Sequence, residues 1–108
     1  MTAPKERRFR GMLGFAMRAG RLIIGTEPVC LAMAKKACGG IRLVIISDSA
    51  SDATKKKLLT KSEFYKVRAA ITDMTADKLG ELLGKAYSPV CVAVCDEGFA
   101  KELLSTLE

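Results

Sequence analysis

The sequence contains no histidine, so it lacks the side chain that most often serves as a general base in enzymes. No serine or cysteine stands in a recognisable nucleophile motif, and no GxGxxG loop is present to hold a cofactor. The four cysteines form no CxxC pair, the close spacing that structural zinc sites normally use. We therefore expect no enzymatic activity, no cofactor and no metal. We expect inert, buried thiols without a disulfide at Cys30, Cys38, Cys91 and Cys95.

Long apolar runs are also missing. No stretch approaches the roughly 20 apolar residues that span a bilayer, and no apolar signal segment follows the charged N-terminus. These absences predict a soluble, cytoplasmic protein. The chain has 108 residues, nearly half of them hydrophobic, and contains no repeat, linker or low-complexity segment. We expect one domain over residues 1–108, frayed only at residues 1–5.

What the chain has in excess is positive charge, concentrated in its first part. Residues 1–42 carry nine Lys and Arg against two acids, net +7, whereas residues 43–108 carry nine against ten, net −1. A field this uneven attracts a polyanion. Nucleic acid and an anionic membrane surface are both possible partners, and the lack of membrane signals favours nucleic acid.

Residues 6–19 have the spacing of a helix with one apolar side and one arginine side. The apolar side consists of Phe9, Met12, Leu13 and Ala16. The opposite side consists of Arg7, Arg10 and Arg18. An ordinary solvated helix face would look similar, but arginine in particular supplies the forked donors that suit phosphate oxygens.

The stretch from Arg18 to Glu27 predicts an anion-docking edge. The first helix would end at Gly20, residues 22–24 would form a short strand, and Gly25 would lead into a helix capped by the Thr26 hydroxyl. Free amides at a helix start, beside arginine, can bind a phosphate. The same residues are also typical of an ordinary turn between a strand and a helix.

Helices and strands alternate along the rest of the chain. Residues 90–94 are apolar on both faces, so this strand belongs in the middle of a sheet with helices on both sides. The pattern predicts a three-layer α/β/α sandwich with a central mixed sheet of about four strands. We expect helices over 26–38, 51–62, 75–83 and 98–107, and strands over 42–47, 68–72 and 90–94.

Short motifs in matching order over about 90 residues resemble the ribosomal protein L-seven-Ae / L-thirty-e superfamily, in its bacterial YlxQ-type branch. They include Gly14 to Arg21, Gly25-Thr26-Glu27, Ser47 to Ser51, Thr54 to Lys57, Phe64 to Val67, Leu79-Gly80, Gly84-Lys85 and Val92 to Lys101. The resemblance implies a three-layer fold that binds structured RNA, commonly a kink-turn with tandem sheared G·A pairs.

By position, the resemblance implies an RNA edge made of two segments. One is the helix start at residues 25–28 with Arg21 before it, and the other is the loop at residues 73–76 with Lys78 beside it. In this reading the arginines neutralise phosphates, the amides of Gly25 and Thr26 bind the bend, and Met74 covers exposed bases. The candidate RNA-binding residues are Arg18, Arg21, Gly25, Thr26, Glu27, Pro28, Asp73, Met74, Thr75 and Lys78.

Three residues depart from the family pattern. Well-known kink-turn binders have Asn or Lys at the position of Glu27, Glu or Gln at that of Pro28, and a basic residue at that of Leu31. These departures predict weakened or retuned RNA affinity. Leu31 fits core packing as well as an altered contact, and Glu27 could simply complement the dipole of its helix start.

The sequence thus favours a monomeric, non-enzymatic protein that binds kink-turn or similarly bent RNA. A role at the ribosome or with translation factors fits this class, and ribosomal RNA would be one such ligand. The alternative is a protein-interaction module of the translation apparatus whose RNA binding is weak or lost. A third reading, the RNA-binding part of a methyltransferase, finds no support because no GxGxxG loop is present.

Overall fold

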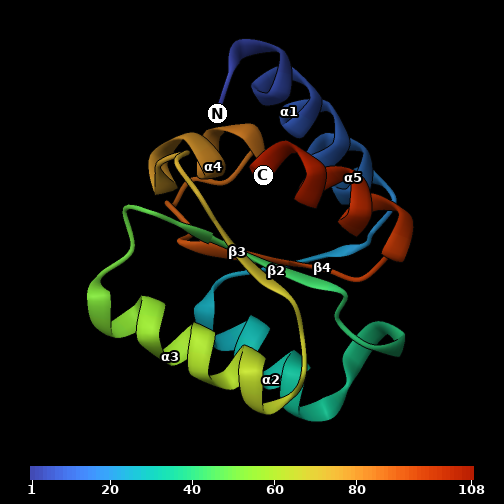
Figure 1. The fold of residues 1–108 in the computed structure, drawn as a ribbon, viewed down its shortest axis with the longest axis vertical. Helices are drawn as coiled ribbons and strands as arrows, with labels where there is room; N and C mark the ends of the chain where they lie inside the picture. The colour runs from blue at the N-terminus through green and yellow to red at the C-terminus, as the bar shows by residue number, and fades with distance from the viewer.

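A four-stranded sheet forms the middle layer of the protein (Figure 1). The computed structural model describes residues 1–108. The strands are β1 (Leu22–Ile24), β2 (Leu43–Ser47), β3 (Ala69–Thr72) and β4 (Cys91–Val94). They lie in the order β1-β4-β2-β3; β2 and β3 are parallel, and the other pairs are antiparallel. The predicted mixed sheet of four strands is confirmed.

Helices cover both faces of this sheet, which confirms the predicted α/β/α sandwich (Figure 1). One layer contains α1 (Ala3–Arg18), α4 (Ala76–Leu82) and α5 (Glu97–Leu107). The other layer contains α2 (Thr26–Lys35) and α3 (Asp52–Phe64). The two central strands, β2 and β4, are buried along their whole length because side chains on both of their faces pack against helices.

Alternation along the central strands divides the core into two clusters. On one face of β2, Leu43 and Ile45 pack with Phe9 and Leu13 of α1. On the other face, Val44 and Ile46 belong to the cluster that includes residues of α2 and α3. A shift of one residue in strand register would exchange these faces, so both layers fix the register.

Two helix ends differ clearly from the sequence prediction. Helix α1 begins at Ala3, so residues 3–5 are helical where fraying was expected, and Pro4 occupies its first turn, where no backbone donor is needed. Helix α2 stops at Lys35, because Lys36 adopts a left-handed conformation with φ 51°. A short 3₁₀ turn over Ala37–Gly39 then follows where the helix was expected to continue. None of the helices is both long and apolar enough to cross a bilayer.

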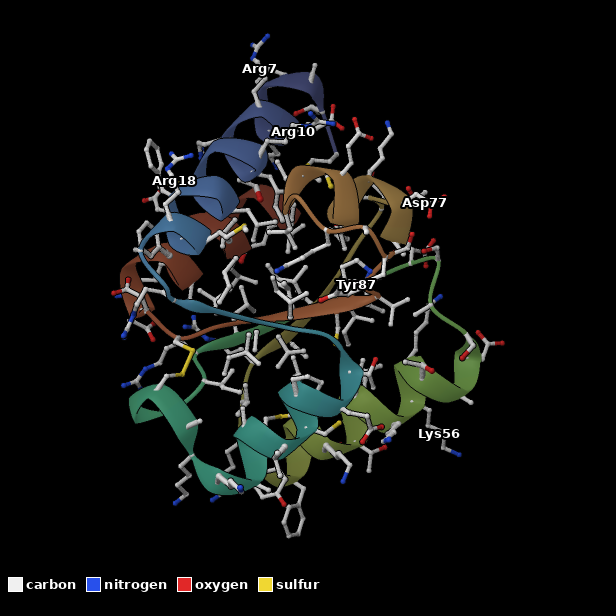
Figure 2. All side chains as sticks on the ribbon, turned by 180° about the vertical axis from the view of Figure 1, so that it is seen from behind. Arg7, Arg10, Arg18, Lys56, Asp77 and Tyr87 are labelled. Atoms are coloured by element: carbon white, nitrogen blue, oxygen red, sulfur yellow. A yellow bond between two sulfur atoms is a disulfide. The ribbon has the colours of Figure 1, made fainter.

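The expectation that all four cysteines are free thiols is wrong for two of them. Cys38 and Cys95 form a disulfide that joins the 3₁₀ turn to the end of β4, visible in Figure 2 as a yellow bond. The two residues are 57 positions apart in sequence, and Cys38 lies in the turn after α2. Cys30 and Cys91 are free and buried, as expected.

Candidate nucleic-acid interface

The start of α2 offers two backbone amides without a partner in the protein. Gly25 adopts φ 104° and forms the N-cap of the helix, where its carbonyl accepts a hydrogen bond from the Val29 amide at 3.0 Å. Neither the Thr26 nor the Glu27 amide donates to a protein group, as expected for the first turn of a helix. These two N–H groups, together with the helix dipole, can hold an anion.

The predicted role of the Gly25 amide is wrong. Its N–H donates to the Cys91 carbonyl at 3.0 Å, so it extends the ladder between β1 and β4 and is not free for a phosphate. A strand that runs directly into a helix keeps its last amide in the sheet, and the free donors therefore begin one residue later.

The predicted cap by Thr26 is also wrong. Thr26 is the first residue inside α2, and its hydroxyl accepts a weak hydrogen bond from the Cys91 thiol, with Sγ and Oγ1 3.9 Å apart. Burial raises the pKa of Cys91 to about 11. The thiol is therefore neutral at physiological pH and serves to pack the helix start onto the sheet.

The charge of Glu27 is offset by a lysine from the neighbouring helix. Its Oε1 atom accepts a hydrogen bond from Nζ of Lys57 at 2.9 Å. This hydrogen bond and the positive charge of Lys57 lower the pKa of Glu27, and Glu27 in turn raises the pKa of Lys57. Pro28 completes the turn; it is exposed and packs beside Gly25 in the first turn, where its missing N–H costs nothing.

A loop that the sequence reasoning missed lies next to this helix start. Residues 84–90 lead directly into Cys91, the residue whose carbonyl accepts the Gly25 amide. Within this loop Tyr87 is 55% exposed, although it lies in a short turn between two structured elements. An exposed tyrosine can stack on an unpaired base. The available signal was an aromatic residue between the Gly84-Lys85 motif and Pro89.

Close contact with α4 holds this loop in place. A Cβ atom added at Gly80 would lie 2.3 Å from the Tyr87 carbonyl oxygen, so only glycine allows this approach. The Lys85 amide donates to the Gly80 carbonyl at 2.8 Å, and the Ser88 hydroxyl donates to the Asp77 carboxylate. Figure 2 shows Asp77 and Tyr87 on the same side of the molecule.

The predicted second segment, residues 73–76, lies farther from the start of α2 than a single compact site would require. It follows β3, which is separated from β1 by two strands, a distance of roughly 14 Å at ordinary strand spacing. Met74 is only 4% exposed and belongs to the core, so the prediction that it covers bases is wrong. Asp73 forms an ion pair with the N-terminal amine of Met1. Thr75 caps α4, because its hydroxyl oxygen accepts a hydrogen bond from the Lys78 amide at 3.2 Å.

The basic residues near the helix start are lysines of α3. Lys55 pairs with Asp48 at 3.1 Å and Lys57 with Glu27, whereas Lys56 is exposed and forms no ion pair. Lys78, in the first turn of α4, is likewise exposed and without an ion pair. Much of the local positive charge is therefore already balanced by acids.

The arginines do not lie around the helix start, contrary to the prediction of an anion-docking edge beside arginine. Arg21 is half-buried and lies at the opposite end of β1 from Gly25, where its Nη2 donates to the Cys95 carbonyl at 3.2 Å. Arg18 belongs to α1, in the helical layer on the other face of the sheet. Figure 2 shows Arg7, Arg10 and Arg18 along α1 and Lys56 beyond the sheet. The amphipathic period of α1 was predicted correctly, but not its place relative to α2.

Comparison with known proteins identifies the family. The model of the ribosomal protein L7Ae/L30e/S12e/Gadd45 family matches residues 7–104. The chain belongs to this family. Two curated relatives carry the name RNA-binding protein YlxQ. That of Bacillus subtilis is 35% identical over 97 residues, covering 90% of this chain and 92% of the relative. That of Enterococcus faecium is 31% identical over 108 residues, covering 100% of this chain and 99% of the relative.

Solved structures share the fold of this family member. A protein of unknown function from Bacillus halodurans matches with a TM-score of 0.80 and 34% identity, covering 92% of this chain and 95% of that chain. A Giardia lamblia 15.5kD RNA binding protein matches with a TM-score of 0.74 and 12% identity, covering 99% of this chain and 88% of that chain. At this low identity the match shows the fold alone. The family and both curated relatives are named as ribosomal or RNA-binding proteins and not as enzymes, in line with the non-enzymatic prediction.

Proposed function

We propose that the protein binds structured RNA at an edge formed by the start of α2 and the loop at residues 84–90. Two observations carry this proposal: the amides of Thr26 and Glu27 have no partner, and the loop that leads into Cys91, which bonds to Gly25, carries the exposed ring of Tyr87. The amides and the helix dipole suit a phosphate, and the tyrosine suits a base that has left its stack. The names of the curated relatives point to the same class of ligand.

The shape of this edge favours bent RNA over a straight duplex. A sharp bend, as in a kink-turn, exposes a phosphate and an unstacked base close together, whereas a regular A-form helix keeps its bases stacked inside. The two groups that would bind them come from adjacent strands, because β1 leads to Thr26 and β4 follows Tyr87. In this proposal the protein reads the shape of the RNA more than its sequence.

Glu27 sets the strength of this interaction. A carboxylate at the mouth of a phosphate site repels the backbone, and Lys57 reduces that repulsion by pairing with it. The amides bind the phosphate, while Lys56 of α3 and Lys78 of α4, both exposed and without an ion pair, can contact phosphates farther along the RNA. We expect weaker binding than in relatives with a basic side chain at this position, but binding that keeps its preference for bent RNA.

The biological setting we propose is translation, with a monomeric protein of the cytoplasm bound to ribosomal RNA or to another bent RNA. The test is fluorescence anisotropy at 0.15 M salt with two RNA duplexes of equal length. One contains a kink-turn with tandem sheared G·A pairs, and the other is fully paired. We expect at least tenfold tighter binding to the bent duplex. Equal affinity for both duplexes would refute the proposal.

An interaction with protein is a second candidate, favoured by exposed apolar side chains on the α2–α3 layer. Leu31 is 56% exposed and Phe64 is 76% exposed. Leu31 therefore does not belong to the core, which was one of the two readings of this residue. If the protein is an interaction module of the translation apparatus, a pull-down will recover the same partner after nuclease treatment, and Leu31→Ser with Phe64→Ser will abolish the recovery.

A further inference from the structure

The outer face of α1 carries positive charge that nothing in the protein neutralises. Arg7, Arg10 and Arg18 are exposed, and none of them forms an ion pair or a side-chain hydrogen bond. The contrast with Arg8 on the same helix is clear, because Arg8 pairs with Glu102 of α5 at 3.9 Å. From Arg7 to Arg18 the helix rises by about 16 Å, so these charges form an elongated strip.

An aromatic ring lies within this strip. Phe15 is 54% exposed, and the Arg18 guanidinium carbon lies over the ring, 4.9 Å from its centroid. A phenylalanine at an exposed helix position does not give the fold the stability that its burial would provide. An exposed ring among guanidinium groups is instead the combination that binds single-stranded nucleic acid, where bases stack on aromatic rings and cations follow the phosphates.

Two glycines, Gly11 and Gly14, leave part of the same face of α1 without side chains. A Cβ atom added at Gly11 would meet nothing within 4 Å, and one at Gly14 would meet only the Arg18 side chain, at 3.7 Å. Glycine inside a helix is less stable than alanine, so packing within the protein does not explain either residue. Both lie along the helix between Arg7 and Arg18 and within about 40° of Arg7 around its axis, where a missing side chain lets a partner approach the helix backbone.

This strip is separate from the edge at the start of α2. Helix α1 covers one face of the sheet, and α2 and α3 cover the other (Figure 1). In Figure 2 the three arginines extend along α1, while Lys56 lies beyond the sheet. Both surfaces can therefore be occupied at the same time.

We propose that the strip defined by Arg7, Arg10, Phe15 and Arg18 binds a single-stranded RNA segment, independently of bent RNA at the α2 edge. Arg7 and Arg10 contact phosphates, and Phe15, with Arg18 over its ring, stacks against a base. The choice of RNA as the partner rests on the proposed function, but the strip itself does not depend on the bent-RNA edge. A protein with two such surfaces joins a folded RNA element to a flanking strand.

The experiment measures anisotropy of a fluorescein-labelled 12-nucleotide uridine RNA at several salt concentrations. We expect R7Q/R10Q to weaken binding at least tenfold and to reduce the salt slope by about 1.4, because each phosphate contact on a single strand contributes about 0.7. Phe15→Leu should weaken binding by about fivefold to a hundredfold through the lost stack. A matched control, K35Q/K36Q, removes the same charge at the far end of α2 and should change binding less than threefold.

Three results would overturn the proposal: equal losses in R7Q/R10Q and K35Q/K36Q, no effect of Phe15→Leu, or displacement of the oligonucleotide by saturating kink-turn duplex. A membrane role is also tested. If R7Q/R10Q loses binding to vesicles with 30% anionic lipid but binds the oligonucleotide unchanged, the proposal is overturned and the strip binds a membrane surface. Circular dichroism checks that each variant is folded. If the oligonucleotide results hold while bent and straight duplexes bind equally, the strip stands and the proposed α2 edge fails.

Discussion

The Glu27 carboxylate lies 2.9 Å from the Lys57 ammonium, and this ion pair ties the first turn of α2 to α3. The pair places a carboxylate where a phosphate would approach and a lysine ammonium group in contact with that carboxylate. The pair therefore affects both the pH behaviour and the RNA affinity of the protein.

The first prediction concerns the titration of Glu27. Lys57 lowers the pKa of Glu27 below its ordinary value of 4.5, so the charged carboxylate is favoured in the folded state. A group with a lowered folded pKa contributes stability that is present above its unfolded pKa and is lost as pH falls through the folded pKa. We expect a carboxyl NMR midpoint below 4.5 for Glu27, moving upward in Lys57→Gln. An unchanged midpoint in that variant would show that the pair does not form in solution.

The second prediction concerns RNA affinity. Glu27→Gln removes a negative charge from the phosphate site and should tighten binding to a kink-turn duplex by about three- to tenfold at low salt. Lys57→Gln should weaken it by a similar factor, because Glu27 then faces the RNA uncompensated. Anisotropy titrations measure both changes. Lys35→Gln, at the other end of α2, is the charge-matched control for Lys57→Gln, and an equal effect of these two variants would count against the site.

The third prediction concerns the support of the Tyr87 loop. Gly80→Ala forces a Cβ atom against the Tyr87 carbonyl, 2.3 Å away in the present arrangement. We expect a loss of about 1–3 kcal/mol in the free energy of unfolding, as for overpacking in general, together with weaker RNA binding as the loop shifts. Urea denaturation followed by circular dichroism measures the stability.

Gly11→Ala is the matched control, because its added Cβ meets nothing within 4 Å. It should raise the free energy of unfolding by up to about 1 kcal/mol, since alanine is the better helix former. If both substitutions change stability in the same direction, the close approach at Gly80 is not what makes that glycine necessary.

The fourth prediction concerns the disulfide between Cys38 and Cys95. Without reductant, the unfolded protein should contain two reactive thiols, those of Cys30 and Cys91, and four after reduction. Because the bond closes a loop with a sequence separation of 57, its reduction should lower the free energy of unfolding by about 2–4 kcal/mol. Thiol counting with a chromogenic reagent and denaturation with and without reductant check both parts. Four reactive thiols in the unreduced protein would contradict the bond.

Most of the fold could be predicted from local sequence because it depends on local patterns. Apolar residues on both faces placed β4 in the middle of the sheet, and the strand at Leu22–Ile24 was predicted with its observed ends. Helix ends were less certain. Lys36 ends α2 by adopting a left-handed conformation, which lysine rarely does and which no sequence pattern announces.

The site was harder to predict because it depends on contacts between distant segments. The Gly25 amide is occupied by Cys91, 66 positions later, and Glu27 is paired by a lysine of another helix. Met74 looked like an accessible loop residue, but its place between β3 and α4 turns its side chain into the core. Tyr87 was overlooked because strand pairing brings the end of its loop, at Cys91, to the start of α2, and local spacing does not reveal strand pairing.

The most direct test of the α2 edge is an NMR titration of ¹⁵N-labelled protein with a kink-turn duplex. The account predicts large shifts for the Thr26 and Glu27 amides and for residues 84–88, and smaller shifts for the Gly25 amide, which is held in the sheet. The fully paired duplex should leave these amides nearly unchanged. If both duplexes shift the same residues equally, or if the Thr26 and Glu27 amides do not respond to the bent RNA, the central claim is contradicted.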